Sequence, residues 1–349
     1  MTKIFKRQIF IPIAAMLALL LFNLIIDPSF FHISLTTNNA GDPVLSGNLI
    51  SILNNGSELA ILALGMTLVT AASGGQDISV GATIAIAGSV VLKIVCGANE
   101  VSVGIVLVAF LVACLVSMAF GAFNGALVSI FKIQPMVATL ILFTAGRSIA
   151  AWINNNAQIN ISDPKFTYIA EFFPGLPIPT PFLITILCFI IMALFMKFTN
   201  IGLYSQAVGI NENSSKLNGI NPVFIKFLTF VILGLCVAVC GLIKVSRSRG
   251  ITYSSIAENI EMDAILAVAL GGNALGGGKF NMTASVIGAY VIQILTTTLY
   301  KYNISSAALS AYKAIVVIVL VVISAPTVRR KAKAVTDKIK ANFARKEVA

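Results

Sequence analysis

The sequence predicts an all-α fold: a polytopic transmembrane helical bundle of about ten spans with broken or short helices. Apolar residues make up 58% of the 349-residue chain, charged residues make up 11%, and the mean hydropathy is +0.95. Soluble globular domains carry about 25% charged residues. Apolar runs of roughly 20 residues, the length that crosses a bilayer as a helix, recur along the chain. We therefore treat residues 1–349 as a single transmembrane domain.

The positive charge follows the pattern of a membrane protein. The formal net charge is +11, but the basic residues gather at the termini and in connecting segments instead of along one soluble face. Cytoplasmic loops rich in Lys and Arg explain this distribution, so we expect no nucleic-acid partner. Basic residues before the first apolar run and in the tail 327–349 place both termini in the cytoplasm. Termini on the same side require an even number of crossings, and we count ten.

The expected elements follow from the lengths of the apolar runs. A short run at 264–270 cannot cross the bilayer by itself. The run at 101–122 ends close to Gly121, Asn124 and Gly125, whose small and amide side chains permit close helix packing. The five cysteines lie in or beside apolar runs without a CxxC pair, so they indicate neither a metal site nor a disulfide. The long spans are expected at 8–26, 48–72, 79–96, 101–122, 135–152, 181–198, 222–244, 281–300 and 307–325.

A glycine-rich break separates the second and third expected spans. Residues 65–91 read GMTLVTAASGGQDISVGATIAIAGSVV, two apolar runs interrupted at Gly74 to Asp77. Freed backbone at membrane depth is tolerated only inside protein or beside water, and an acidic residue there faces a bundle interior or a cavity. The break is therefore part of a translocation path or a tight surface loop in which Asp77 caps the next helix. The residues alone leave both interpretations open.

A second break echoes the first. Residues 58–65 read ELAILALG and residues 263–271 read DAILAVALG, and each is followed by a glycine-rich break and an apolar run. Repeats with interrupted helices in matching positions indicate a transport pathway near the membrane midplane. The loop GGNALGGGK does not fit a phosphate-binding loop, because Asn273 and Phe280 occupy positions that require Gly and Ser or Thr. The sequence thus indicates no ATP-hydrolysing site in this chain.

Several basic residues conflict with the topology. Lys244, Arg247 and Arg249 fall on the outer side by our count. Acidic residues follow at 258–263, so we expect a re-entrant or externally folded segment with its own charge pairing. Arg147 comes late in its span, and we expect its side chain to snorkel to the outer surface.

The segment 199–221 is the most hydrophilic interior part of the chain. It is too polar to span a bilayer, and Pro222 marks the start of the following helix. The residues alone fit either an inert connecting loop or a short helix at the membrane surface that docks to a cytoplasmic partner.

Four segments together resemble a known family. They are GMTLVTAASGGQDISVGA, KIQPMVATLILFTAGR, LYSQAVGINENSSKLNGI and DAILAVALGGNALGGGKFN, and their order and spacing cover nearly the whole chain. The sequence resembles the permease subunits of bacterial ABC importers for monosaccharides, the ribose and galactose group, and within it the permeases of galactofuranose importers. Gln76 departs from the family's usual apolar residue, and Lys279 replaces the more usual Arg.

The resemblance implies a division of labour among several chains. It implies a multi-pass permease of the bacterial inner membrane that imports a monosaccharide by alternating access and pairs with a second copy or a sister permease. ATP and Mg²⁺ would reside on cytoplasmic ABC ATPase subunits, with no cofactor in this chain, and a periplasmic or lipid-anchored protein would deliver the sugar. The alternatives are an ABC permease for a nucleoside or autoinducer, and an ion-coupled secondary transporter using Glu58, Asp77 or Asp263.

Two sets of residues follow from the motifs, with neither a catalytic residue nor a metal ligand among them. The expected substrate pathway comprises Gly74, Gly75, Gln76, Asp77, Ser79, Asn124, Thr139, Gly271, Gly272 and Asn273. The resemblance assigns ATPase docking to 199–221, with Ala207, Gly209, Asn211, Glu212, Lys216, Asn218 and Gly219 as the contact residues.

Overall fold

The computed structural model describes residues 9–37, 43–98, 100–305, 308–309, 311–316 and 318. The chain divides into two compact units, Met1–Thr297 and Thr298–Ala349, and the first contains both glycine-rich breaks. The basic tail 327–349 and most of the expected span 307–325 lie outside the described residues.

The described part of the chain is mainly helical with almost no sheet, which confirms the all-α prediction. A short antiparallel hairpin, β1 (Ser34–Thr37) with β2 (Pro43–Ser46), follows the 3-10 helix η1 (Pro28–Phe31). The longer helices are α1 (Phe10–Ile26), α2 (Asn48–Ser73), α3 (Val80–Cys96), α4 (Val103–Ser129), α5 (Pro135–Ile153), α7 (Thr180–Phe198), α10 (Pro222–Ser248), α11 (Ile260–Leu270) and α12 (Met282–Lys301). The short helices are α6 (Pro164–Thr167), α8 (Ile201–Ile210) and α9 (Glu212–Leu217).

The lengths of these helices agree with most of the expected spans. Six described helices are long and apolar enough to cross a membrane: α2, α4, α5, α7, α10 and α12. Helices α1 and α3 have 17 residues each, which is near the lower limit for a span. Each of these eight helices overlaps one expected span, and the break between α2 and α3 falls at residues 74–79 as predicted.

Burial separates central helices from peripheral ones. The most apolar window of α2 is 94% buried, whereas those of α4 and α7 are 22% and 17% buried. On α4, Val103, Leu107, Leu111 and Leu115 recur every fourth residue and are all exposed. A helix face of this kind suits contact with lipid, so α2 lies at the centre of the bundle and α4 at its edge.

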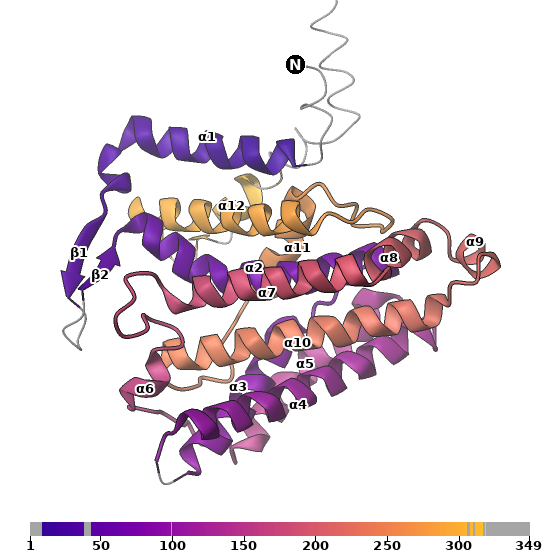
Figure 1. Cartoon of the computed structure of the whole chain (residues 1–349), viewed down its shortest axis with the longest axis horizontal. Helices are drawn as coiled ribbons and strands as arrows, with labels where there is room; N and C mark the ends of the chain where they lie inside the picture. Colours follow the sequence, from indigo (N-terminus) through magenta and orange to yellow (C-terminus); the bar gives the residue numbers. More distant parts are fainter. Residues whose placement is uncertain are drawn as a thin grey trace, which may run out of the picture. The chain divides into compact units, whose positions relative to one another are not determined.

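Helices α4 and α10 cross at close range, and Figure 1 shows them side by side. A Cβ atom added at Gly121 would overlap the carbonyl oxygen of Phe230, and one at Gly234 would lie 2.5 Å from that of Ser117. Only glycine allows the backbones to approach so closely. This confirms the packing role expected at the end of the 101–122 span.

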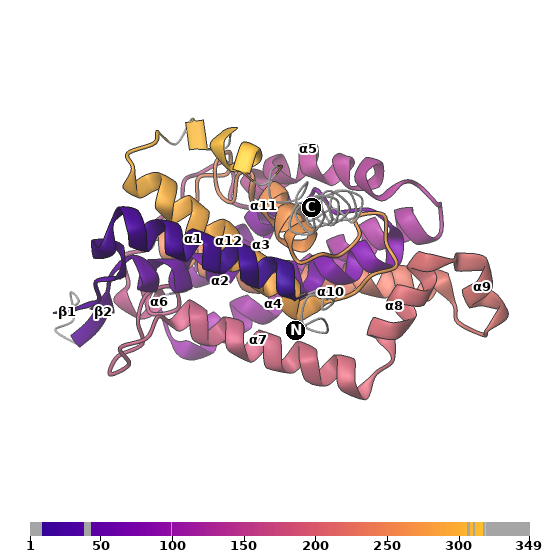
Figure 2. The ribbon, with the colours of Figure 1, turned by 90° about the horizontal axis from the view of Figure 1, so that it is seen from above.

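The two ends of the bundle carry different structures. Figures 1 and 2 show the β1–β2 hairpin and α6 at one end and α8 and α9 at the other. We call these the hairpin end and the α9 end. Helix α2 starts at the hairpin end and finishes at the α9 end, and α10 runs the opposite way, with Ser246 donating a hydrogen bond to the carbonyl of Phe166 in α6.

The segment after α10 turns back into the bundle. Ile251 lies beside Gly88 of α3, but Ala257 and Glu261 lie beside Gly81. Those glycines are seven residues apart, so the chain descends roughly 10 Å along α3 before α11 begins. Of the two forms that we expected, the structure shows the re-entrant one, and α11 is a half-helix that starts inside the bundle.

We predict that Gly121→Ala lowers the thermal stability of the detergent-solubilised protein. The added methyl group has no room against Phe230, and overpacking of this kind costs about 1–3 kcal/mol. The matched control is Gly104→Ala on the same helix, where the nearest atom to a new Cβ is 3.9 Å away, so its melting temperature should not fall. Equal melting of both variants and the wild type would contradict the close crossing.

Candidate functional site

The two glycine-rich breaks meet in the structure. Gly74 ends α2 with a φ of +64°, and a Cβ there would lie 2.9 Å from the carbonyl oxygen of Gly276. The backbone N–H of Gly278 donates to the carbonyl of Ala71 at 3.0 Å. The side-chain amide of Gln76 donates to the carbonyl of Leu275 at 2.8 Å. We call residues 74–77 and 271–278 together the glycine junction.

Helix α8 packs directly on the glycine junction. A Cβ added at Gly209 would overlap the carbonyl oxygen of Ala71 and lie 2.6 Å from the backbone nitrogen of Gly278. One added at Gly278 would lie 2.7 Å from the side chain of Ile210. The end of α2, the second glycine loop and α8 therefore form one tightly packed unit at the α9 end.

Four residues expected in the substrate pathway form a buried polar network. Asp77 Oδ1 accepts hydrogen bonds from the backbone N–H of Ser79 at 2.8 Å and from its hydroxyl at 2.6 Å. The Asn124 amide on α4 donates to Ser79 Oγ at 2.9 Å and to Asp77 Oδ2 at 3.3 Å. The Thr139 hydroxyl on α5 accepts from the backbone N–H of Ile78 at 3.1 Å. The network thus ties the first break to two neighbouring helices.

Asn273 ties the second break to a neighbouring helix by hydrogen bonds. Its amide donates to Ser285 Oγ at 2.8 Å, and its side-chain oxygen accepts from the backbone N–H of Asn281 at 2.7 Å. Gly271 lies against the backbone of Ser285, where a Cβ would have only 2.7 Å. Asn273 therefore holds the loop that contains Gly271 and Gly272 against the start of α12.

In this conformation the expected pathway residues are packed instead of lining an open channel. The six polar side chains of the set, Gln76, Asp77, Ser79, Asn124, Thr139 and Asn273, are each at most 6% exposed. Asp77 accepts from the backbone N–H of Ser79, but the N-cap residue of α3 is Ser79 itself, and it makes no side-chain capping bond. These side chains are therefore packed inside the bundle.

Helix α9 is held to the bundle by a charged contact. Asn211 caps it by accepting a hydrogen bond from the backbone N–H of Ser214 at 2.9 Å. Glu212 pairs with Lys226 of α10 at 2.7 Å and with Lys216 at 3.7 Å. The hydrogen bond from Lys226 lowers the pKa of Glu212 below its usual value, so the pair stays charged at neutral pH.

The expected docking residues divide into two groups. Asn211, Lys216, Asn218 and Gly219 are exposed, whereas Gly209 faces the glycine junction and is an internal packing residue. Sequence reasoning missed two exposed apolar side chains beside the exposed group, Leu217 at 89% and Ile210 at 70% exposure. The sequence could have indicated both residues, because they are isolated apolar residues within a hydrophilic segment.

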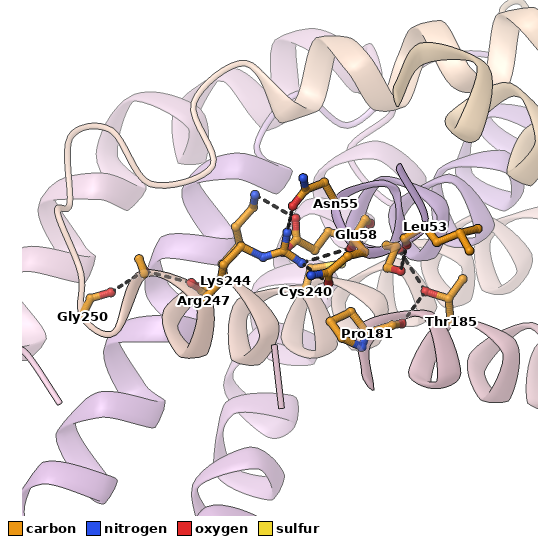
Figure 3. A network of polar contacts seen from close by, with 12 residues as sticks. Leu53, Asn55, Glu58, Pro181, Thr185, Cys240, Lys244, Arg247 and Gly250 are labelled. Atoms are coloured by element: carbon orange, nitrogen blue, oxygen red, sulfur yellow. Dashed lines mark hydrogen bonds and ion pairs between the residues drawn. The ribbon is translucent and has the colours of Figure 1, made fainter. Parts of the chain in front are cut away.

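A buried carboxylate at the hairpin end pairs with two basic side chains (Figure 3). Glu58 of α2 is 2% exposed, and its oxygens lie 2.8 Å from Lys244 Nζ and 3.2 Å from Arg247 Nε. Arg247 also donates to the Asn54 carbonyl at 3.0 Å and to the side chain of Asn55. The pairing joins α2 to α10 inside the helix layer.

This network corrects our expectation about charge pairing after α10. The ionic partners of Lys244 and Arg247 come from α2, and Arg249 pairs with Glu171 at 2.9 Å, in place of the acidic residues at 258–263. The sequence suggested local pairing because those acids follow closely along the chain. The re-entrant course places Glu258 and Asp263 in the wall of a cavity that Lys244 also lines.

Arg147 does not snorkel to the surface as we expected. Its guanidinium donates to the carbonyls of Tyr253 and Ile256, both at 2.9 Å, and the neighbouring Gly146 lies against Ala82 near the start of α3. Carbonyl groups of an irregular segment at membrane depth need such donors. Arg147 therefore anchors the re-entrant segment inside the bundle.

Broken apolar helices, a half-helix inside the bundle and a polar extension at one end together define a multi-pass transport permease. The family model described as "Branched-chain amino acid transport system / permease component" matches residues 48–325. The chain belongs to this family of inner-membrane permeases, and it is a transport subunit instead of an enzyme.

Three relatives cover most of the chain. It is 37% identical over 311 residues to the galactofuranose transporter permease protein of Escherichia coli (strain K12), covering 89% of this chain and 88% of that protein. It is 34% identical to the fructose import permease protein of Bifidobacterium longum (strain NCC 2705), with coverage of 90% and 87%. It is 33% identical to the ribose import permease protein of E. coli (strain K12), with coverage of 88% and 91%. No solved structure matches the chain significantly.

We predict that Gly209→Ala loosens α8 from the glycine junction. The new methyl group would overlap the Ala71 carbonyl, so the variant should lose about 1–3 kcal/mol of stability and become more sensitive to protease within α8 and α9. The control is Gly276→Ala in the glycine junction, where a Cβ meets nothing within 4 Å. Wild-type melting and proteolysis of Gly209→Ala would refute the packing role.

Proposed function

We propose that this chain is the membrane-spanning permease subunit of an ATP-driven ABC importer that moves a monosaccharide by alternating access. Family membership and three relatives named for galactofuranose, fructose and ribose support a sugar substrate of the galactofuranose, galactose or ribose type. ATP and Mg²⁺ would be held by separate ATPase chains. A second permease copy or sister permease and a periplasmic or lipid-anchored sugar-binding protein would complete the importer.

The observation that carries the proposal is the contact between α8 and the glycine junction. Helix α9 presents exposed side chains to a partner, and α8 connects α9 rigidly to the ends of α2 and the second glycine loop. A displacement of α9 by an ATPase would therefore reach both breaks at once. Packed interfaces of this kind shift between discrete arrangements instead of deforming continuously.

Two of the three candidate acids for ion coupling, Glu58 and Asp77, favour this proposal over a secondary transporter. Glu58 is held by two cations, and Asp77 accepts hydrogen bonds from Ser79 and Asn124. A carboxylate that carries protons or sodium through a membrane has to exchange partners during the cycle. Carboxylates with fixed partners suit a structural role better than an ion-carrying role.

The orientation of the chain in the membrane follows from the positions of the basic residues. We place the α9 end in the cytoplasm, because Lys132, Lys197 and Lys216 lie in or beside its connecting segments. Of the three basic residues that conflicted with the topology, Lys244 and Arg247 are bound to Glu58 inside the bundle, and Arg249 is paired with Glu171. The hairpin end then faces the periplasm and the sugar-binding protein, and both termini are cytoplasmic.

The test is reconstitution of the permease in vesicles with the ATPase and binding protein encoded beside it. Uptake of labelled galactose, fructose or ribose should require internal ATP and continue in the presence of an uncoupler. Uphill uptake by the permease alone, or uptake that an uncoupler abolishes and ATP does not affect, would overturn the proposal.

We predict that Leu217→Asp weakens the complex with the ATPase without changing the stability of the permease. Leu217 is 89% exposed, and burial of a leucine side chain contributes about 1.5–3 kcal/mol, so the dissociation constant should rise on the order of 10- to 100-fold. Leu35→Asp on β1, also a highly exposed position, is the matched control at the other end. Equal ATPase binding by both variants would remove α9 from the docking surface.

A further inference from the structure

A polar cavity of about 270 Å³ lies beside the Glu58 network. It is enclosed by α2, α10, the re-entrant segment, the start of α11 and the second half of α12. Its polar lining comprises Asn55, Glu58, Lys244, Ser255, Glu258 and Gln293, with Asp263 from the first turn of α11. The volume is close to the lower limit of roughly 300 Å³ for small-molecule pockets, which suits a ligand of monosaccharide size.

The cavity lies within the helix layer, between the start of α2 and the glycine junction. Glu58 is ten residues into α2, about 15 Å from its start, and sixteen residues before Gly74, about 24 Å from the glycine junction. Ser255 and Glu258 belong to the re-entrant segment and are exposed in the cavity wall. The exposed residues in its wall leave the cavity accessible to a small solute, whereas the side chains of the glycine junction are packed.

The lining combines hydrogen-bond donors and acceptors, with one basic side chain, Lys244, and three acidic side chains, Glu58, Glu258 and Asp263. Lys244 lies 2.8 Å from the carboxylate of Glu58, so the most buried acid of the cavity is neutralised. The amide groups of Asn55 and Gln293 and the hydroxyl of Ser255 complete the polar lining. Sugar hydroxyls both donate and accept, and they match such a mixture.

The cavity offers weak binding, as a transport path requires. Its lining includes no aromatic side chain among the described residues, so a sugar ring would find hydrogen bonds but no flat apolar surface to stack on. A solute that passes through must leave again, and a few polar contacts without stacking allow that.

We propose that this cavity is a transient subsite for a neutral monosaccharide on its way from the hairpin end to the glycine junction. The inference rests on the proposed import function and assigns to it residues that the sequence motifs did not contain. Helix α11 links the two places, since Asp263 in its first turn lines the cavity and Gly271 at its end belongs to the glycine junction. Movement of the junction would therefore tilt one wall of the subsite.

The experiment is sugar protection of an introduced cysteine in the complete importer in vesicles. Ser255→Cys places a thiol in the cavity wall, and Thr36→Cys on the exposed face of β1 is the control; labelling of the wild type is subtracted for the native cysteines. A membrane-impermeant maleimide is applied from outside with millimolar galactose, fructose or ribose. We expect one of these sugars to slow labelling of Ser255→Cys several-fold and to leave Thr36→Cys unchanged.

Uptake in the same vesicles separates the two possible failures. Gln293→Leu removes a hydrogen-bonding group from the cavity and should raise the KM for uptake several-fold while the ATPase rate is kept. ATP-driven sugar uptake without protection of Ser255→Cys, and with an unchanged KM in Gln293→Leu, would overturn the subsite alone. Protection by sodium or calcium ions instead of sugars would also overturn it. Absence of uptake of any sugar would overturn the proposed function itself.

Discussion

Backbone groups that a broken helix frees inside a bilayer must find partners within the protein, and this constraint shapes the whole bundle. The first break is satisfied by the second: Gly278 donates to the carbonyl of Ala71, and Gln76 donates to that of Leu275. The re-entrant segment is satisfied by Arg147, which donates to two of its carbonyls. Each irregular piece of chain therefore requires a particular neighbour, and these requirements position α8 and α11.

Helix α11 connects the two ends of this arrangement. It begins at the cavity beside Glu58 and ends at the glycine junction on which α8 packs. A short, rigid helix with one end near a proposed sugar subsite and the other near a proposed ATPase contact can transmit motion without a long chain of side-chain contacts. The buried Glu58 pairs join α2 to α10, so the helices on either side of the cavity are held together.

Much of this fold could be predicted from local sequence. Apolar run lengths gave the long helices, and Gly74 and Gly75 marked the first break, because these features depend on a few neighbouring residues. Contacts between distant segments could not be predicted in the same way. The partner of Lys244 lies on α2, and the carbonyls that bind Arg147 belong to a segment more than 100 residues later. Similarly, the six polar residues expected in the pathway are buried in the structure, and no sequence pattern predicted that burial.

The Glu58 pairing also bears on how the protein is assembled. Helix α2 has the lowest hydropathy of the six long helices, 1.4, and it carries the acid that Lys244 and Arg247 neutralise. The ribosome makes α2 early, whereas its basic partners emerge only after two thirds of the chain has been synthesised. The nascent chain thus holds an unmatched carboxylate until α10 arrives, and the centre of the bundle is completed late in biogenesis.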